Sequence, residues 1–485
     1  MTVKTMDFAQ LLNEAAQGRP VKNHSGLVEP GDIFVALPGT RHNGAGFIPD
    51  ALKKGASWVI CPQEERHNYS GEKILSHENP ALALGELARA HYHTDRLNLA
   101  IIGITGTNGK TTTSYLVEHI FRSSGFKTGI IGTVNYRWAE RVLDAPMTTP
   151  DCLRLHEMLC LMDRDGVEMV VMEVSSHALE QDRVAGIDFD AGVFTNLSQD
   201  HLDFHEDMQR YFQAKSKLFL NFERKKSFRA VINADDEYGR ILLETIPGAI
   251  SFGLGQAGSA KLRGRLVKND RAGISLECTY KDQQWTINSN LSGRHNGSNL
   301  LAAQGAALSM GLAPEHFACL ESSGQIPGRL EKIENEQNLD IYVDYAHTPD
   351  ALENVCLALK SLDFNRLIVL FGCGGNRDRS KRPRMGKAAA GLADAVFLTS
   401  DNPRDEDPLD ILRDIRPGLN GCKELYVEPD RQKAINMAVR HMKPGDALLV
   451  AGKGHETYQE VKGVRLPFSD VQEIKKALSM DLKWK

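Results

Sequence analysis

A glycine-rich segment at residues 103–112 carries the clearest chemical signal in the chain. It reads GITGTNGKTT and follows the apolar stretch LAII. Gly106, Gly109 and Lys110 are spaced as in a variant phosphate-binding loop, in which backbone N–H groups and the next helix N-terminus attract phosphate. The lysine would reach the terminal phosphates of a nucleotide, and Thr111 would bind the accompanying magnesium ion. A strand, a glycine turn and a helix in this order predict an ATP site.

Acidic and imidazole side chains follow the next two apolar stretches. Glu173 ends VEMVVME, and His201 lies in TNLSQDHLDFH after AGVF. A carboxylate at a strand end beside a phosphate loop is well placed to hold Mg²⁺, and His201 is a second candidate ligand. Without the loop, each residue would more often be an ordinary hydrogen-bonded polar group. These residues indicate a protein that uses ATP, and kinases, ATPases, nucleotide switches and ligases all remain open.

The composition is that of a folded protein without a strong charge bias. The chain has 485 residues, of which 41% are hydrophobic and 25% charged, and a net charge of -5. This small charge argues against a nucleic-acid partner, which requires a broad basic surface. No uncharged apolar run approaches the ~20 residues that span a bilayer, and the amphipathic N-terminal segment lacks signal-peptide features. We therefore expect a cytoplasmic protein that neither binds nucleic acid nor inserts into a membrane. A monomer is the expected state, although neither charge nor hydropathy decides it.

Apolar stretches that alternate with helical patterns predict three α/β domains. GDIFVAL and ASWVICP are typical of strands in a small first domain, residues 1–97. The apolar runs near the phosphate loop favour a mainly parallel sheet in a central P-loop domain, residues 98–330, with an antiparallel excursion at GISLECTY and QWTINSN. DIYVDYA, RLIVLFG, DAVFLTS and DALLVAG then alternate with helices in a Rossmann-like third domain, residues 331–485.

Motifs along nearly the whole chain resemble those of the Mur ligase family and occur in the family's order. They are GTNGKTT, EVSSHAL, TNLSQDHLDFH, YFQAKSKLF, LSGRHNGSNLLAA, PGRLE, VDYAHTPDAL and FGCGGNRDRSKRP. The resemblance implies a ligase in which ATP phosphorylates a substrate carboxylate. An amine then attacks the acyl phosphate, giving an amide, ADP and phosphate. Lys110 and Mg²⁺ would supply positive charge where the two anions meet.

The resemblance also implies the residues that bind ATP and the metal. The implied ATP contacts are Gly106, Thr107, Asn108, Gly109, Lys110, Thr111, Thr112, Asn296, Arg329 and Asp344. The implied catalytic residues are Lys110, Lys215 and His201, and the implied magnesium ligands are Thr111, Glu173, His201 and Lys215 as a carbamate. By residue type alone, Asn296 would be a turn residue, Asp344 a cap at a strand end and Lys215 a solvated helix lysine.

Within the family, the chain resembles most closely the branch that extends a UDP-linked muramoyl dipeptide. The implied contacts to this substrate are Ser25, Thr148, Thr149, Ser175, Gln181 and Arg183. Arg183 has a clear task, because an anionic substrate needs a fixed cationic partner. Thr148 and Thr149 would otherwise form a helix N-cap before Pro150. Around Ser25 the chain has His-Ser-Gly where the family commonly has Asp-Ser-Arg, which leaves the details of uridine diphosphate binding open.

By the same resemblance, a tetrapeptide specifies meso-diaminopimelate as the incoming amino acid. The implied contacts are Arg377, Asp401, Asn402, Pro403, Arg404, Gly452 and Glu456. Arg404 would bind the carboxylate that lysine lacks, so lysine would leave a buried arginine unpaired at a cost of several kcal/mol. Glu456 suits an ammonium group. Without the resemblance, Asp-Asn-Pro-Arg would be read as a plain β-turn.

Three alternatives remain open. An L-lysine-adding ligase of the same branch would differ at the end of the tetrapeptide. A folate-polyglutamating ligase shares the phosphate loop and the carbamoylated lysine, but does not explain the N-terminal domain. A P-loop ATPase or switch of another class would hydrolyse ATP without any dipeptide or amino acid.

Overall fold

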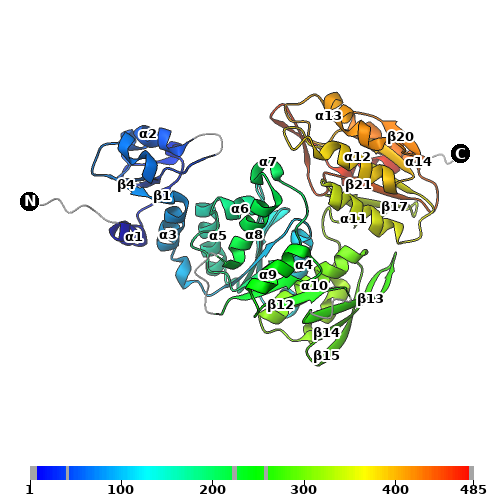
Figure 1. Ribbon diagram of the computed structural model, residues 1–485, viewed down its shortest axis with the longest axis horizontal. Coiled ribbons are helices and arrows are strands. Elements are labelled where there is room, and N and C mark those ends of the chain that lie inside the picture. Colours follow the sequence, from blue (N-terminus) through cyan, green and yellow to red (C-terminus); the bar gives the residue numbers. More distant parts are fainter. Residues whose placement is uncertain (1–7, 40–42, 221–226, 256–259, 480–485) are drawn as a thin grey trace, which may run out of the picture. The chain divides into compact units, whose positions relative to one another are not determined.

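The computed structural model describes residues 8–39, 43–220, 227–255 and 260–479. Helices accompany β-sheets of four, eleven and six strands and a two-stranded hairpin (Figure 1). The chain divides into two compact units. Unit 1 comprises Met1–Thr105, Gly125–Gly192 and Gln213–Arg229, and unit 2 comprises Gly106–Ser124, Val193–Phe212 and Ala230–Lys485. No helix in the described ranges is long and apolar enough to cross a membrane.

The N-terminal sheet has four parallel strands in the order β1-β2-β3-β4. Its elements are α1 (Phe8–Ala16), β1 (Val21–Lys22), β2 (Ile33–Val35), α2 (Ile48–Lys53), β3 (Trp58–Pro62), β4 (Ile74–His77) and α3 (Pro80–Tyr92). Side chains alternate along β2, so Ile33 and Val35 pack with residues of α1 and α3, whereas Phe34 packs with residues of α2. Both faces are covered, which explains why the strands are continuously apolar.

The largest sheet runs in the order β15-β14-β13-β12-β11-β10-β5-β9-β6-β7-β8. Its strands are β5 (Ala100–Thr105), β6 (Thr128–Ile131), β7 (Asn135–Trp138), β8 (Arg141–Asp144), β9 (Met169–Glu173), β10 (Ala191–Phe194), β11 (Arg229–Asn233), β12 (Ile250–Gly253), β13 (Leu262–Asp270), β14 (Gly273–Tyr280) and β15 (Gln283–Ser289). Its helices are α4 (Lys110–Ser123), α5 (Cys152–Arg164), α6 (Ser176–Glu180), α7 (Leu202–His205), α8 (Met208–Leu220), α9 (Glu237–Thr245) and α10 (Arg294–Ser309).

This sheet is antiparallel at both edges. Strand β9 pairs in parallel with β5 and β6, and β12 pairs in parallel with β11 and β13. The antiparallel strands β13, β14 and β15 confirm the excursion predicted from GISLECTY and QWTINSN. The hairpin of β7 and β8 at the other edge was not predicted. Its turn places Ala139 at φ +46° and contains no glycine or asparagine, so the usual hairpin signal is missing.

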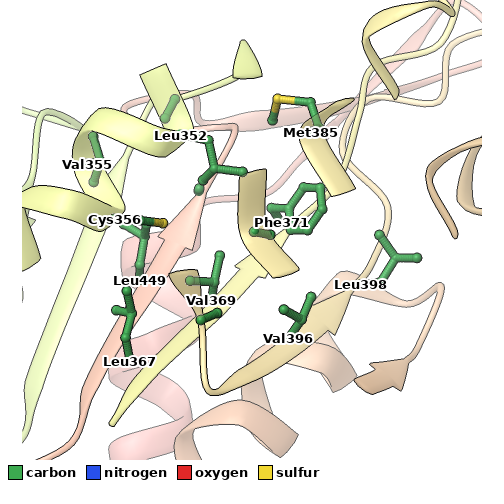
Figure 2. Packing of buried hydrophobic residues seen from close by; sticks show 14 of the residues in the cluster. Leu352, Val355, Cys356, Leu367, Val369, Phe371, Met385, Val396, Leu398 and Leu449 are labelled. Atoms are coloured by element: carbon green, nitrogen blue, oxygen red, sulfur yellow. The ribbon is translucent and has the colours of Figure 1, made fainter. Parts of the chain in front are cut away.

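The C-terminal sheet has the order β16-β17-β21-β18-β19-β20 and is parallel except at β16. Its elements are β16 (Glu331–Lys332), β17 (Asp340–Asp344), α11 (Pro349–Lys360), β18 (Leu367–Phe371), α12 (Lys381–Leu392), β19 (Ala395–Leu398), α13 (Pro408–Ile415), β20 (Glu424–Val427), α14 (Arg431–His441), β21 (Ala447–Ala451) and α15 (Asp470–Ser479), with the hairpin β22 (Tyr458–Val461) and β23 (Val464–Pro467). Figure 2 shows Leu367, Val369 and Phe371 of β18 packed with Leu352 of α11 and Met385 of α12.

The opposite face of the same sheet packs against α14 and α15, where Ile368 and Leu370 of β18 join a second core. Helices on both faces confirm the α/β class predicted for this part of the chain. In such a sheet, ligands bind beyond the carboxyl ends of the strands. Arg377, Asp401 and Gly452 follow the carboxyl ends of β18, β19 and β21, three strands that are neighbours in the sheet.

A buried histidine couples the stability of unit 1 to pH. His156 on α5 is 0% exposed, its Nε2 lies 2.9 Å from the carbonyl oxygen of Ala185, and its Nδ1 lies 2.7 Å from Oγ1 of Thr94. Because a carbonyl only accepts, Nε2 carries the proton of the neutral ring and Nδ1 accepts from the threonine. Burial lowers the pKa of His156 to about 4 from an ordinary 6.5.

We expect this histidine to make the protein less stable as pH falls. The unfolded chain binds the proton near pH 6.5 and the folded chain only near pH 4, so stability is full above pH 6.5 and falls through this window. The loss attributable to the group is about 3 kcal/mol. Urea unfolding at pH 7.5 and pH 4.5 should show a smaller pH effect in His156→Asn than in the wild type. The exposed control His67→Asn should keep the wild-type dependence, and an unchanged dependence in His156→Asn would contradict the assignment.

Candidate active site

The glycine-rich loop joins β5 to α4 and uses two glycines in the left-handed half of backbone space. Gly106 has a φ of +148°, and Gly109, which precedes α4, has a φ of +86°. A Cβ at Gly106 would lie 1.9 Å from Oγ1 of Thr195. Only glycine fits this close approach. The loop conformation therefore depends on the residue types that the motif predicts.

Lys110 begins α4, where the helix N-terminus favours negative charge. Its Nζ donates to the carbonyl oxygens of Gly106 and Thr107, each at 2.9 Å. The ammonium group therefore lies over the loop rather than extending away from it. A phosphate bound by the loop would meet this positive charge directly, which is the arrangement that phosphoryl transfer needs.

Two residues that sequence reasoning missed hold the loop in place. The carbonyl oxygen of Asn196 accepts the N–H of Thr107, and its Oδ1 accepts the N–H of Asn108, both at 2.9 Å. Oγ1 of Thr195 donates to the carbonyl oxygen of Asn108 at 2.7 Å. Both residues lie in TNLSQDHLDFH, where the sequence singles out only His201. The sequence feature that could have identified Thr195 and Asn196 is their position directly after the apolar stretch AGVF.

Two of the other predicted ATP contacts, Arg329 and Asn296, come from later in the chain and connect to the start of α4. Nη2 of Arg329 donates to Oγ1 of Thr111 at 2.8 Å. Asn296 lies in the first turn of α10, so its interpretation as a turn residue, made by residue type alone, is wrong. Its Oδ1 accepts Nδ2 of Asn299 at 3.0 Å, and a Cβ at Gly109 would lie 2.4 Å from Oδ1 of Asn299. Arg329 therefore contacts Thr111 at the start of α4 directly. Asn296 is connected to the glycine-rich loop only through Asn299, which lies beside Gly109.

Asp344, the third of these contacts, ends β17 and is 6% exposed. Its carboxylate accepts the N–H groups of Leu330 at 2.6 Å and Ala346 at 2.7 Å. Burial raises the pKa of Asp344, and the charge of Arg329 partly opposes this. The side chain caps a strand end, as its residue type predicts, and also lies beside Arg329.

In unit 1, three predicted substrate contacts form one hydrogen-bond network. Oγ1 of Thr149 donates to the carbonyl oxygen of Glu173 at 2.8 Å and accepts the N–H of Ser175 at 3.0 Å. Oγ1 of Thr148 lies 3.1 Å from Oγ1 of Thr133, which donates to Oε2 of Glu173 at 2.9 Å. The two threonines are therefore fixed by the strand end that carries Glu173.

The remaining predicted contacts of unit 1 lie in two places. Oε1 of Gln181 accepts Nε of Arg183 at 2.9 Å and Nη2 at 2.5 Å, and Nη1 lies 3.5 Å from the carbonyl oxygen of Thr149. Burial lowers the pKa of Arg183 from its ordinary value, and a guanidinium group stays protonated in proteins. Ser25 lies in a short turn beside the N-terminal sheet, where its carbonyl oxygen accepts Nζ of Lys54 at 2.9 Å.

In unit 2, the loops after β19 and β21 bring four predicted amino-acid contacts together. Oε2 of Glu456 accepts Nδ2 of Asn402 and Nζ of Lys453, both at 2.8 Å. Lys453 is 0% exposed and also donates to Oδ1 of Asn402 at 3.0 Å, although sequence reasoning missed it. Gly452 has a φ of +112°, and a Cβ there would lie 2.5 Å from Oδ2 of Asp401. Burial and the Asp401 carboxylate raise the pKa of Glu456, and Lys453 opposes them.

The expectation that Arg404 is a buried arginine, unpaired without a substrate carboxylate, is wrong. Its side chain is 23% exposed, Nη1 donates to the carbonyl oxygen of Gly375 at 2.8 Å, and Nε lies 3.3 Å from Oε2 of Glu460. It is therefore neither buried nor unpaired when a substrate carboxylate is missing. A Cβ at Gly374 would meet Nη1 of Arg404 at 2.9 Å and Cγ of the exposed Arg377 at 3.8 Å, which places both predicted arginines around this glycine.

Three family models match the chain along its length. They are described as the Mur ligase family catalytic domain at residues 21–92, the Mur ligase middle domain at 104–307, and the Mur ligase glutamate ligase domain at 328–454. A relative from Lawsonia intracellularis, named UDP-N-acetylmuramoyl-L-alanyl-D-glutamate–2,6-diaminopimelate ligase, is 51% identical over 461 residues, 94% of this chain and 95% of the relative. The chain belongs to the Mur ligase family.

Two further comparisons cover this Mur ligase almost completely. A relative of the same name from Aquifex aeolicus is 42% identical over 480 residues, 99% of this chain and 97% of the relative. A solved structure with that name has a TM-score of 0.67 at 34% identity and covers 95% of this chain and 94% of its own. The predicted three-domain architecture is confirmed, while the boundaries after residues 97 and 330 stay predictions.

The predicted metal ligands of this Mur ligase are divided between the two units. Thr111 and His201 belong to unit 2, and Glu173 and Lys215 to unit 1. Glu173 is 1% exposed and accepts two hydrogen bonds from Thr133, one from its N–H at 2.8 Å. Lys215 on α8 is also 1% exposed, so its interpretation as a solvated lysine is wrong. Within the described ranges, no group of three or more His, Cys, Asp or Glu side chains is arranged to hold a metal.

Proposed function

We propose that this Mur ligase joins meso-diaminopimelate to UDP-N-acetylmuramoyl-L-alanyl-D-glutamate at the expense of ATP. The proposal is supported by relatives of that name over nearly the whole chain. The single structural observation that carries it is that the loops after β19 and β21 hold both the guanidinium group of Arg404 and the half-buried carboxylate of Glu456. Such a site offers a cation for a carboxylate and an anion for an ammonium group.

The proposed reaction has two steps. A carboxylate oxygen of the dipeptide attacks the γ-phosphorus of ATP, which forms an acyl phosphate and breaks the bond to ADP. The amine of the incoming amino acid then attacks the acyl carbon, loses a proton and displaces phosphate, which leaves an amide. Lys110 neutralises charge on the transferring phosphoryl group. Arg183 holds an anionic part of the dipeptide substrate.

The incoming amino acid is recognised at its far end in this proposal. That end of diaminopimelate carries both a carboxylate and an ammonium group, whereas lysine carries only an ammonium group. Arg404 binds the carboxylate, and Glu456 binds the ammonium group. Because Arg404 already has partners in the protein, lysine is rejected by a moderate loss of binding rather than by an unpaired buried charge.

Phosphate release with ATP and the UDP-linked dipeptide tests the proposal. We expect release to depend on an added amino acid, and meso-diaminopimelate to have a kcat/KM at least about tenfold above that of L-lysine. A preference for lysine would refute the proposed amino-acid specificity and leave the proposed ligase reaction in place. Release without dipeptide and amino acid would favour an ATPase of another class, and a folate substrate in place of the dipeptide would favour a folate-polyglutamating ligase.

The proposal includes Mg²⁺ and a carbamate on Lys215. The donors suit a hard cation, because Thr111, Glu173 and a carbamate all offer oxygen, with His201 as a further ligand. Bound magnesium would neutralise charge on the phosphates. To form the carbamate, the neutral amine of Lys215 attacks carbon dioxide, a nitrogen–carbon bond forms and a proton leaves. A lysine is rarely buried unless something satisfies it, and Lys215 is 1% exposed.

Carbon NMR with isotope-labelled bicarbonate measures this modification without relying on activity. We expect one carbamate signal in the wild type and none in Lys215→Ala. Lys217→Ala is the matched control, because Lys217 lies on the same helix but pairs with Glu180 at 2.9 Å. The control should keep the signal, and equal spectra for the wild type and Lys215→Ala would refute the carbamate.

The proposal also includes a monomeric protein that acts in the cytoplasm.

A further inference from the structure

The acidic side chain of Glu460 lies beside the proposed amino-acid site and has no role in the proposed ligase reaction. Glu460 lies on β22, and its Oε2 is 3.3 Å from Nε of Arg404. The two side chains are 27% and 23% exposed, so solvent reaches the pair only in part. Partial shielding makes such an ion pair stronger than one on the open surface.

Backbone hydrogen bonds set Glu460 beside Arg404. The N–H of Arg404 donates to the carbonyl oxygen of Glu460 at 3.0 Å, and the N–H of Lys462 donates to the carbonyl oxygen of Arg404 at 2.7 Å. The N–H of Glu460 also donates to Oδ1 of Asn402 at 2.9 Å. Arg404 and Val461 thus form a parallel β-bridge. The segment that carries the specificity residues is paired with β22, and the two side chains start from fixed positions.

The guanidinium group of Arg404 is held at two of its nitrogens. Nη1 donates to the carbonyl oxygen of Gly375, and Nε faces Glu460. Because a guanidinium group is rigid and planar, two partners fix its orientation. Nη2 has no hydrogen-bond partner among the described residues, and Nη1 has a second hydrogen. This edge of the guanidinium group has the donors that a carboxylate can accept from.

We propose that Glu460 is a positioning residue that holds the Arg404 guanidinium ready for the distal carboxylate of a diamino diacid. The inference rests on the proposed function. A side chain that is already held loses less conformational freedom when the ligand binds, so the ligand binds more tightly. The opposite role, in which the Glu460 carboxylate competes with the substrate for Arg404, makes a prediction of opposite sign.

Steady-state kinetics of Glu460→Ala and Glu460→Gln test the inference. We expect the KM for meso-diaminopimelate to rise roughly three- to tenfold in Glu460→Ala, with kcat and the KM for ATP unchanged. Glu460→Gln should recover only part of the loss, because it keeps the size and a polar oxygen of the side chain but removes the charge that pairs with Nε. In an Arg404→Ala background, Glu460→Ala should change nothing further, because it acts through that arginine. Glu277→Ala is the control for the loss of one surface charge, because Glu277 on β14 pairs with Arg265 on β13 at the surface.

Each other outcome has a definite meaning. A lower KM in Glu460→Ala would identify a competitor, and an unchanged KM would leave no role for the pair, so either result overturns the inference. An equal effect in the Arg404→Ala background also overturns it. A wild type that uses lysine as well as diaminopimelate overturns the proposed function and this inference together, whereas a selective wild type with a silent Glu460→Ala overturns the inference alone.

Discussion

Replacing Lys110 with methionine is expected to lower kcat by about a thousandfold or more, because the transition state loses a fixed positive charge. The ammonium group lies over the phosphate loop, 2.9 Å from two of its carbonyl oxygens. Methionine keeps the length and helix propensity of the side chain and removes only the charge. The loop itself is shaped by Gly106 and Asn196, which the substitution leaves in place. Activity should therefore fall far more than stability.

Phosphate release at saturating ATP, dipeptide and diaminopimelate measures the change in kcat, and thermal unfolding measures the change in stability. Lys433→Met is the control, because the side chain of Lys433 is 69% exposed. Its helix, α14, packs against the face of the C-terminal sheet that α15 also covers. We expect this control to behave like the wild type. Retention of more than about a tenth of kcat in Lys110→Met would contradict the role given to this residue.

The fold was largely predictable because its strands are covered on both faces. Apolar runs such as RLIVLFG have no polar alternation, and β18 accordingly contributes Leu367, Val369 and Phe371 to one core (Figure 2). Its Ile368 and Leu370 join a second core on the other face. The hairpin of β7 and β8 escaped prediction because it is an edge whose short strands are half polar. Its turn also lacks the usual glycine or asparagine.

The site was less predictable from residue types, because burial and long-range partners decide the roles. Thr148 and Thr149 precede a proline as N-cap residues do, yet the cap of α5 is Asp151, which accepts the N–H of Arg154. Thr149 instead bonds the end of β9. Lys215 has the sequence context of a surface helix and becomes buried only through tertiary packing. Only the resemblance to a family pointed to this lysine.

Residues that position others were missed for the same reason. Lys453 lies in Gly-Lys-Gly-His-Glu, where residue type alone suggests a solvated lysine, and it is buried against Asn402 and Glu456. The tetrapeptide around Asn402 is also more than a plain turn, because Arg404 pairs with Val461 on β22. Strand pairing between segments more than fifty residues apart cannot be read from either segment alone.

Replacing Arg404 with alanine is expected to lower kcat/KM for meso-diaminopimelate by about a hundredfold, because the distal carboxylate loses a charge-assisted partner. The kcat/KM for lysine should change little, since lysine has no carboxylate at that end. Selectivity between the two amino acids should therefore collapse. Arg404→Lys should recover only part of the loss, because an ammonium group lacks the planar fork that receives a carboxylate. The partner Glu460 would also retain a cation in Arg404→Lys and none in Arg404→Ala.

Competition assays that contain both amino acids measure the selectivity, and the products are separated by their mass. Arg413→Ala is the matched control, because its side chain on α13 is 75% exposed and pairs with Asp410. If Arg404→Ala kept the wild-type preference, the discrimination would have to come from Arg377, the other predicted arginine near Gly374. The carboxylates of Glu456 and Asp401 cannot supply it, because a carboxylate attracts the ammonium group that lysine and diaminopimelate share. The preference for a diacid therefore depends on a cation at this end of the site, and Arg404 is the residue whose free edge is expected to provide it.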